Sequence, residues 1–463
     1  MVRGRALVCV CLGLLVVVPS ASGGSTGAAA PVARIGMNYF DGWSDLLSNH
    51  HFDGLVRAGV NGAFRGRQPL SGWRDNTLAA MRASLNWAHQ DGVDFFFFDW
   101  YYRPASADGG ATLNTALGNY MKLPAHDGVG AALMYVNVDP FVVPASDWQS
   151  TVERWVTEDF ANPDYARVDG KPLLVIMDSF RFTEQWGGSA GVNAALDVLR
   201  RTAIAHGLPG VFVVGSVFVG TCVDSVGWDY FASMIRGESW DALTQYAYPA
   251  AACVRDGPQP YSDLVAAGES SWNWYATSFD SPNIPTVMVG WDPRPWDERP
   301  AGHLWWFEST PAQFGGFVGD AISWANEHPE QMVEPPPARP IVLVTSWNEL
   351  GEGEAVIPNR DSGYGYGQAL AEAVGLPRPE PTRQTLSITA GRGGIVKAVP
   401  AAASCRSRCR TAIDDGWQVI LTAIPRHGYI FRGWSGGCRG PGRSCSFIIE
   451  HDTSVRATFK RSK

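Results

Sequence analysis

Short apolar runs that end in polar residues alternate along the chain with longer stretches of helical periodicity. This alternation predicts parallel strands joined by crossover helices. Eight such runs predict a (β/α)8 barrel over residues 34–376, although the sixth run is short and mixed. The predicted strands are Arg34–Tyr39, Val93–Asp99, Val129–Asn137, Pro172–Asp178, Gly210–Ser216, Trp228–Ser233, Ile284–Gly290 and Ile341–Trp347. The predicted helices are Asp75–Gln90, Ala111–Leu123, Asp147–Phe160, Val192–His206, Ser262–Thr277, Pro311–Glu327 and Gly365–Val374.

The end of the chain has a different pattern. Residues 377–384 are rich in proline and have the composition of a domain linker. Residues 385–463 contain short β-rich segments separated by glycine and proline, without helical periodicity. We therefore expect a small all-β domain after the barrel. We interpret its excess of arginine as a solvated face, with attachment to a cell wall or another polyanion as the alternative.

Residues 1–24 have the features of a secretory signal peptide. Arg3 and Arg5 precede an apolar run from Ala6 to Val18, and small residues suitable for cleavage follow. The run is too short for a membrane span, and no other segment looks membrane-spanning. We therefore expect an exported protein, secreted and in some settings associated with the cell surface. Loss of the two arginines takes the net charge from −8 to −10, which argues against nucleic acid and anionic membranes as partners.

The cysteines agree with export, because disulfides form in oxidising compartments. The six that follow the signal peptide are Cys222, Cys253, Cys405, Cys409, Cys438 and Cys445. The first two are expected to pair with each other, or to be two buried thiols. The last four allow three connectivities, of which two local bridges fit the spacing, and a four-thiolate zinc site is the alternative. The nine histidines show no H-E-x-x-H spacing, so we expect no metal site and no cofactor.

In a (β/α)8 barrel, functional side chains lie where strands end at their C-terminal side. The candidates for substrate binding at these positions are Tyr39, Asp41, Asp99, Trp100, Tyr101, Asn137 and Trp291. Asp139, Asp178 and Asp292 also follow strands, and for them a helix N-cap or a turn is an equally good interpretation. The Phe95–Phe98 run is interpreted as barrel core. The 19 tryptophans of the chain also suit carbohydrate binding.

The eighth predicted strand ends at a glycine-rich segment that carries Glu349 and Glu352. Two carboxyls only three residues apart cannot both ionise freely, so one pKa tends to rise and the other to fall. Glycoside hydrolysis needs such a pair, one group to donate a proton and one to accept it or attack. Trp347 beside them is placed to stack on a sugar ring, and Asn348 to bind the substrate. Alternatively, the acids only lie at the start of the next helix, where negative charge is mildly favourable.

The motif Trp347–Gly353, followed by Ile357-Pro358 and Gly363–Tyr366, carries a family resemblance. Together with Asn38–Phe40 and Asp99–Tyr102, it makes residues 35–374 similar to glycoside hydrolase family 99 and its relatives. These include family 71 α-glucanases and O-antigen-cluster proteins labelled glycosyltransferase-like. The resemblance implies an endo-acting, retaining α-glycosidase.

The resemblance also implies roles for the two glutamates. Glu349 would assist the 2-hydroxyl of the sugar as it attacks the anomeric carbon, giving a 1,2-anhydro sugar. Glu352 would act as acid and then as base. The mannosidase members have Trp-His between the glutamates, whereas this chain has Leu350-Gly351, closer to the O-antigen-cluster pattern. The sugar, endo-mannan or glucan, is therefore left open, and Glu354 is a third acid whose role is unassigned.

The tail resembles the divergent internalin-type B repeat, a bacterial surface module. The matching residues are Gly393–Val396, the Cys405/Cys409 pair, Val419–Ala423, Phe431–Gly436, Cys438–Cys445 and Val455–Phe459. The resemblance implies a β domain with an attachment or spacer role, and it makes Trp434 a core residue. Two further hypotheses stand beside a secreted polysaccharide hydrolase. One is a non-catalytic carbohydrate-binding or surface-attachment protein, and the other is a glycosyltransferase, against which export argues because nucleotide-sugar donors are cytoplasmic.

Overall fold

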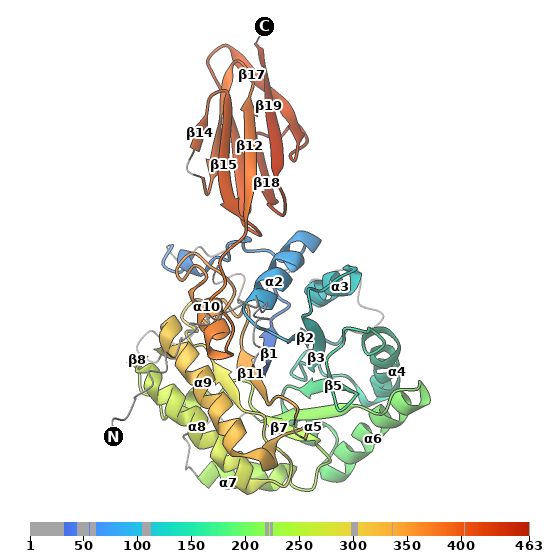
Figure 1. The fold of residues 1–463 in the computed structure, drawn as a ribbon. Helices are drawn as coiled ribbons and strands as arrows, with labels where there is room; N and C mark the ends of the chain where they lie inside the picture. The colour runs from blue at the N-terminus through green and yellow to red at the C-terminus, as the bar shows by residue number, and fades with distance from the viewer. Residues whose placement is uncertain are drawn as a thin grey trace, which may run out of the picture.

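The larger domain is a nearly closed barrel of eight parallel strands (Figure 1). The computed structural model describes residues 32–43, 55, 62–103, 113–217, 222, 226–297, 304–335, 337–401 and 403–462. The strands run in the order β7-β6-β5-β3-β2-β1-β11-β9, and a parallel bridge between Leu243 and Asn283 joins the two ends. Their bounds are β1 Arg34–Tyr39, β2 Phe95–Trp100, β3 Gly130–Tyr135, β5 Lys171–Ile176, β6 Phe212–Ser216, β7 Ala242–Thr244, β9 Thr286–Met288 and β11 Ile341–Thr345. The barrel fold predicted from the sequence is confirmed.

The sixth predicted strand was wrong. Residues 228–233 lie inside helix α7 (Val226–Ile235), and the sixth barrel strand is β7, only three residues long. Trp228, Ala232 and Ile235 are buried, whereas Tyr230 is 63% exposed. The buried residues are spaced three to four apart, as on one face of a helix. Over only six residues this pattern resembles a strand of mixed apolar and polar residues. The other seven predicted strands overlap the observed ones.

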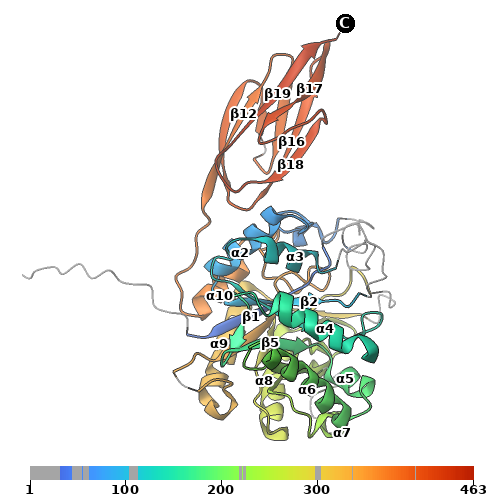
Figure 2. The same ribbon diagram turned by 90° about the vertical axis from the view of Figure 1, so that its right-hand side faces the viewer.

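Helices surround the barrel on its outside (Figures 1 and 2). They are α2 Leu78–Gln90, α3 Thr115–Lys122, α4 Trp148–Arg154, α5 Ser179–Gln185, α6 Ser189–Ala205, α8 Tyr261–Ser278, α9 Pro311–Glu327 and α10 Gly365–Ala373. Short strands β4 Arg167–Val168, β8 Gly257–Gln259 and β10 Trp305–Phe307 lie outside the ring of eight. None of the helices in the described ranges is both long and apolar enough to cross a bilayer. The predicted signal peptide lies outside the described residues.

Large side chains fill the barrel interior, so it is a core and not a channel. The Phe96 ring lies 5.2 Å from the Tyr39 ring and 5.3 Å from the Trp347 ring, measured between centroids. All of β2 is buried, as expected for a strand covered on both faces. The core role predicted for Phe95–Phe98 is confirmed.

The smaller domain consists of two four-stranded sheets. One has the order β15-β12-β19-β17 and the other β14-β13-β16-β18. Disulfides join Cys405 to Cys409 and Cys438 to Cys445, so the local connectivity is confirmed and the zinc alternative was wrong; a third, in the barrel, joins Cys222 to Cys253. Trp434 is buried in the core of this domain. The strand bounds are β12 Arg383–Ala390, β13 Gly394–Val399, β14 Ala403–Cys405, β15 Arg408–Asp414, β16 Gln418–Pro425, β17 Tyr429–Gly436, β18 Ser444–Ile448 and β19 Thr453–Arg461.

One end of the β domain packs against helix α2 and the segments beside it (Figure 2). Gly416, in the turn before β16, has φ +81°, and a Cβ there would lie 2.5 Å from the Trp87 ring of α2. Only glycine therefore permits this close approach. Trp417 packs against both hydrophobic cores, and its Nε1 donates to the Tyr364 hydroxyl at 2.7 Å. The two domains thus share a specific interface.

Candidate active site

A tight loop after β11 carries all three glutamates of the sequence motif; we call residues Trp347–Glu354 the glutamate loop. The backbone N–H groups of Glu352 and Glu354 both donate to the Glu349 carbonyl, each at 3.1 Å. The Ser346 hydroxyl accepts from the Glu349 N–H at 2.7 Å and donates to the Glu354 carbonyl at 2.6 Å. Gly353 has φ +70°, a conformation that L-residues adopt with difficulty. Gly353 thus allows the chain to fold back on itself.

The loop buries its carboxyl groups close to a fourth one from β2. Glu349, Glu352 and Glu354 are 4%, 9% and 2% exposed, and Asp99 at the end of β2 is 3% exposed. Burial raises the pKa of Glu352 to about 8, helped by the charge of Asp99, and burial raises the pKa of Asp99 to about 7. The pKa values of Glu349 and Glu354 also rise, because burial and then the charge of Glu352 disfavour ionisation. The cluster therefore retains protons near neutral pH.

Hydrogen bonds from other barrel residues orient two members of this carboxyl cluster. The Tyr246 hydroxyl donates to Glu349 Oε1 at 3.2 Å. Asn38 Nδ2 donates to Asp99 Oδ1 at 2.7 Å, and the Tyr101 hydroxyl donates to Asp99 Oδ2 at 3.3 Å. Tyr246 was missed from the sequence because it follows β7, the strand that was misplaced. Its position two residues after the apolar run Ala242–Thr244 is the signal that would have found it.

Several predicted substrate-binding residues form hydrogen bonds that hold the scaffold together. Asn348 exchanges two hydrogen bonds with the backbone of Phe40, which ties the glutamate loop to the end of β1. The Asp41 carboxylate accepts from the backbone N–H groups of Ala116 and Leu117, at the start of α3. The Tyr39 hydroxyl donates to a neighbouring carboxylate, at 3.2 Å. All three predicted residues are at most 2% exposed, so their structural role is clear.

Of the three tryptophans predicted to bind substrate, two are buried and one is accessible. Trp347 and Trp100 are 0% and 1% exposed. Trp100 packs against Trp155 with ring centroids 4.9 Å apart, so neither buried ring is offered to a ligand. Trp291 is partly exposed and lies 6.2 Å from the ring of Trp305.

Most of the predicted polar residues after the other strands have hydrogen-bond or ion-pair partners. Asn137 is buried and exchanges two hydrogen bonds with the backbone of Asp178, which links the ends of β3 and β5. Asp178 itself caps helix α5 by accepting from the Arg181 N–H at 3.0 Å, so the N-cap interpretation is confirmed for it. Asp139 is exposed. Asp292 is buried and forms ion pairs, as described next.

Arg67, which the sequence did not single out, holds the glutamate loop from outside. Its Nη1 donates to the carbonyl oxygens of Asp292 and Leu350 at 3.1 Å and to that of Gly351 at 3.3 Å. Its Nη2 pairs with the Asp292 carboxylate. Arg294 binds the same carboxylate at 2.6 Å and 2.8 Å. One half-buried guanidinium thus connects the loops that follow β1, β9 and β11.

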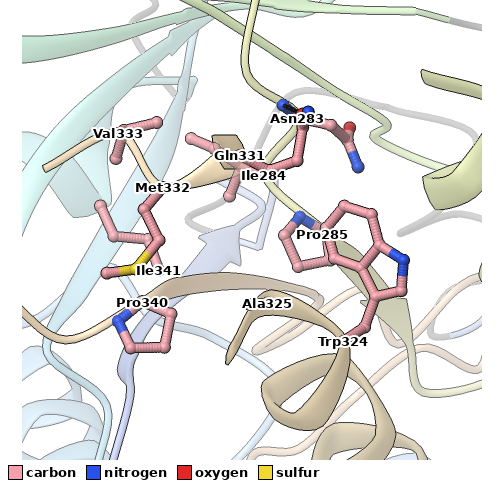
Figure 3. A pocket seen from close by; sticks show the side chains of 10 residues that line it. All are labelled: Asn283, Ile284, Pro285, Trp324, Ala325, Gln331, Met332, Val333, Pro340 and Ile341. Atoms are coloured by element: carbon pink, nitrogen blue, oxygen red, sulfur yellow. Dashed lines mark hydrogen bonds between the residues drawn. The ribbon is translucent and has the colours of Figure 1, made fainter. Parts of the chain in front are cut away.

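Cavities lie at both ends of the barrel. One of about 590 Å³ lies beside the glutamate loop, lined by polar groups that include Arg67, Asp292, Glu308, Asn359 and Tyr366, but not by Glu349 or Glu352. Figure 3 shows a second, lined by residues such as Pro285, Trp324 and Ile341. It lies at the start of β9 and β11, away from the glutamates, and its volume of about 10 Å³ suits one water molecule. Within the described part of the chain, no group of His, Cys, Asp or Glu is arranged to hold a metal ion.

Comparisons with known proteins agree with this two-domain architecture. Residues 143–370 match the family described as Glycosyltransferase WbsX, and residues 384–463 match the divergent InlB B-repeat domain. No curated protein sequence matches the chain. Both resemblances inferred from the sequence motifs, to the O-antigen-cluster relatives and to the B repeat, are confirmed.

Solved structures resemble the chain in fold. A glycoside hydrolase-like protein superposes with a TM-score of 0.52 and 15% identity, covering 77% of this chain and 97% of that one. A family 99 endo-alpha-mannosidase from Bacteroides thetaiotaomicron gives a TM-score of 0.47 and 14% identity, covering 74% and 95%. The barrel therefore has the fold of a glycoside hydrolase-like protein.

The raised pKa of Glu352 predicts how stability varies with pH. In the folded protein Glu352 keeps its proton until the pH approaches its pKa of about 8. In the unfolded chain the pKa is the usual 4.5, so the proton is released at lower pH. The free energy of unfolding should therefore fall as pH rises from 4.5 to 8, by on the order of a few kcal/mol. Glu352→Gln should make the decline shallower in melting curves across this range, whereas exposed Glu372→Gln should not. An identical decline in all three proteins would contradict burial of Glu352 as an acid.

Proposed function

We propose that the barrel is a glycoside hydrolase that cleaves α-glycosidic bonds of a polysaccharide with net retention. The observation that carries this proposal is the pair Glu349 and Glu352, both buried on one tight loop at the C-terminal end of the eighth strand, next to Asp99. This is the end of a (β/α)8 barrel where catalytic groups are found. A buried carboxylic acid with a pKa near 8 is a competent proton donor at neutral pH.

In the proposed first step Glu349 removes the proton of the sugar 2-hydroxyl, whose oxygen attacks the anomeric carbon. Glu352 gives its proton to the departing glycosidic oxygen, and a 1,2-anhydro sugar forms. Water then opens this ring: Glu352 takes a proton from the water, and Glu349 returns its proton to the 2-oxygen. Both carboxyls end in their starting state, and two inversions at the anomeric carbon give retention.

The environment of the pair supports these opposite starting states. An ionised Glu352 raises the pKa of Glu349, so a neutral Glu352 makes ionisation of Glu349 easier. The hydrogen bond from the Tyr246 hydroxyl favours the Glu349 carboxylate and opposes part of the rise caused by burial. Burial, together with the charge of Asp99, raises the pKa of Glu352 and keeps it protonated. These contacts support the proposed assignment of base to Glu349 and acid to Glu352.

The proposal predicts the outcome of a substrate screen. α-Mannans, α-glucans and bacterial cell-wall glycans should be incubated with the enzyme and assayed for new reducing ends. At least one α-linked polymer should be cleaved, and Glu349→Gln and Glu352→Gln should each abolish cleavage while circular dichroism shows an intact fold. Binding without cleavage of any glycan would instead support a carbohydrate-binding protein.

The description of the matched family favours glycosyl transfer as the second candidate. A transferase would require a nucleotide-sugar donor, and activity that appears only when one is added would establish it. We propose export to the cell exterior for either activity. The basic and apolar start of the chain, the three disulfides and the B-repeat domain support this localisation.

A further inference from the structure

Charge is divided unevenly between the two domains. Residues 383–463 contain fourteen Lys and Arg against four Asp and Glu, a net charge of +10. The preceding 382 residues contain 23 and 41, a net charge of −18. The overall charge of −8 hides this separation. A domain of about eighty residues with this excess attracts anions over its surface, so the location of its basic side chains matters.

One sheet of the β domain presents five basic side chains on its outer face. The pairing of β15, β12 and β19 places Thr389 directly opposite both Arg408 and Arg456. Ser387 lies opposite Arg410 in the same way. Alternation along β12 confirms the outward direction, because its intervening residues are buried. We call the following exposed residues the basic face: Arg408, Arg410, Arg432, Arg456 and Lys460.

The basic face has no acidic counterpart. No residue of the basic face forms an ion pair with another described residue. The four acids of the domain make contacts elsewhere: Asp414 with Tyr364, Asp415 with Asn86, Glu450 with Arg82, and Asp452 with the N–H of Thr385. Three of these contacts cross the interface with the barrel. The cationic side chains are therefore left available to a partner.

The chemistry of this face indicates what it binds. The planar guanidinium group forms paired hydrogen bonds with a carboxylate, and the hydroxyls of Ser387, Thr389 and Ser454 lie between the arginines, suited to sugar hydroxyls. The exposed residues of these four strands include no aromatic side chain on which a nucleic-acid base would stack. We propose that the basic face binds an acidic polysaccharide through the carboxylates of its uronic acid units. Neighbouring strands lie about 4.8 Å apart, so Arg408 and Arg456 are separated by about 10 Å, a span that successive sugars of an extended chain can bridge.

Binding of the full-length protein to polygalacturonate, with neutral dextran as the reference polymer, tests the proposal. The triple variant Arg408→Glu, Arg410→Glu, Arg456→Glu should lose at least about tenfold in affinity, because three charge-assisted contacts become repulsive. The matched control Arg392→Glu, Lys397→Glu, Arg443→Glu has the same net charge but alters residues off the basic face, and should retain affinity within about twofold. A triple glutamine variant of the basic face should lose affinity too, which guards against a misfolded charge reversal.

Equal losses in both triple variants would overturn the proposal, because net charge alone would then explain binding. Tighter binding of polyphosphate or DNA than of polygalacturonate would overturn the assignment to carboxylates. Hydrolysis of a neutral α-glycan should be unchanged in the basic-face variant, since none of its residues belongs to the barrel. The binding result therefore stands or falls independently of the proposed hydrolase activity.

Discussion

Glu352→Gln should lower turnover of an α-linked substrate with an alkyl leaving group by roughly 10³-fold. The amide cannot give a proton to the departing oxygen, and that oxygen is too basic to leave as an alkoxide. The dinitrophenolate of a dinitrophenyl glycoside leaves without protonation. The first step for this substrate should therefore be nearly unaffected by the substitution. Comparing kcat/KM for the two substrates in the wild type and the variant measures this dependence on the leaving group.

Glu349→Gln is the matched control for this prediction, because Glu349 acts on the 2-hydroxyl and not on the leaving group. A base that activates the 2-hydroxyl is needed for every substrate, so the dinitrophenyl glycoside should not rescue this variant. Exposed Glu372→Gln should retain full activity on both substrates. Rescue of the Glu349 variant and not of the Glu352 variant would reverse the two assigned roles.

Arg67→Ala should lower the free energy of unfolding by about 2–4 kcal/mol, because it removes one partner of a largely buried ion pair and leaves buried backbone carbonyls unsatisfied. The substitution leaves three backbone carbonyls without their donor and leaves Asp292 with Arg294 alone. Urea denaturation followed by fluorescence measures the loss. Activity should fall as well, because Arg67 fixes the backbone between the two glutamates proposed to be catalytic.

Arg65→Ala, two residues away in the same short helix (Arg65–Arg67) and exposed, serves as the control and should change stability little. Arg67→Lys should fall between the two, since it keeps the charge but loses the fork that reaches several carbonyls. A loss in Arg67→Ala no greater than in Arg65→Ala would contradict the structural role of Arg67.

Most of the barrel was predictable because its strands are buried on both faces and read as uninterrupted apolar runs. Strand β7 escaped detection since three residues give too little pattern, and the nearby helix α7 offered a more apolar segment. That error also concealed Tyr246. In such folds a short strand is set by pairing with its neighbours, which local sequence does not reveal.

The glutamate loop was predictable for a local reason: acids and glycines lie within a few residues of each other. Its supports were not, because Arg67 reaches carbonyls almost three hundred positions away. The roles of Trp100, Trp347 and Asp41 were also beyond sequence reasoning. A residue that follows a strand can point into the barrel or toward a ligand, and a single position decides which.

The most direct measurement of the catalytic role of Glu349 and Glu352 is proton NMR of the first product released from a cleaved α-glycan. The wild type should release the α-anomer before mutarotation, and neither glutamine variant should release product. First appearance of the β-anomer, or undiminished cleavage by both variants, would contradict the assignment of this pair as the catalytic residues.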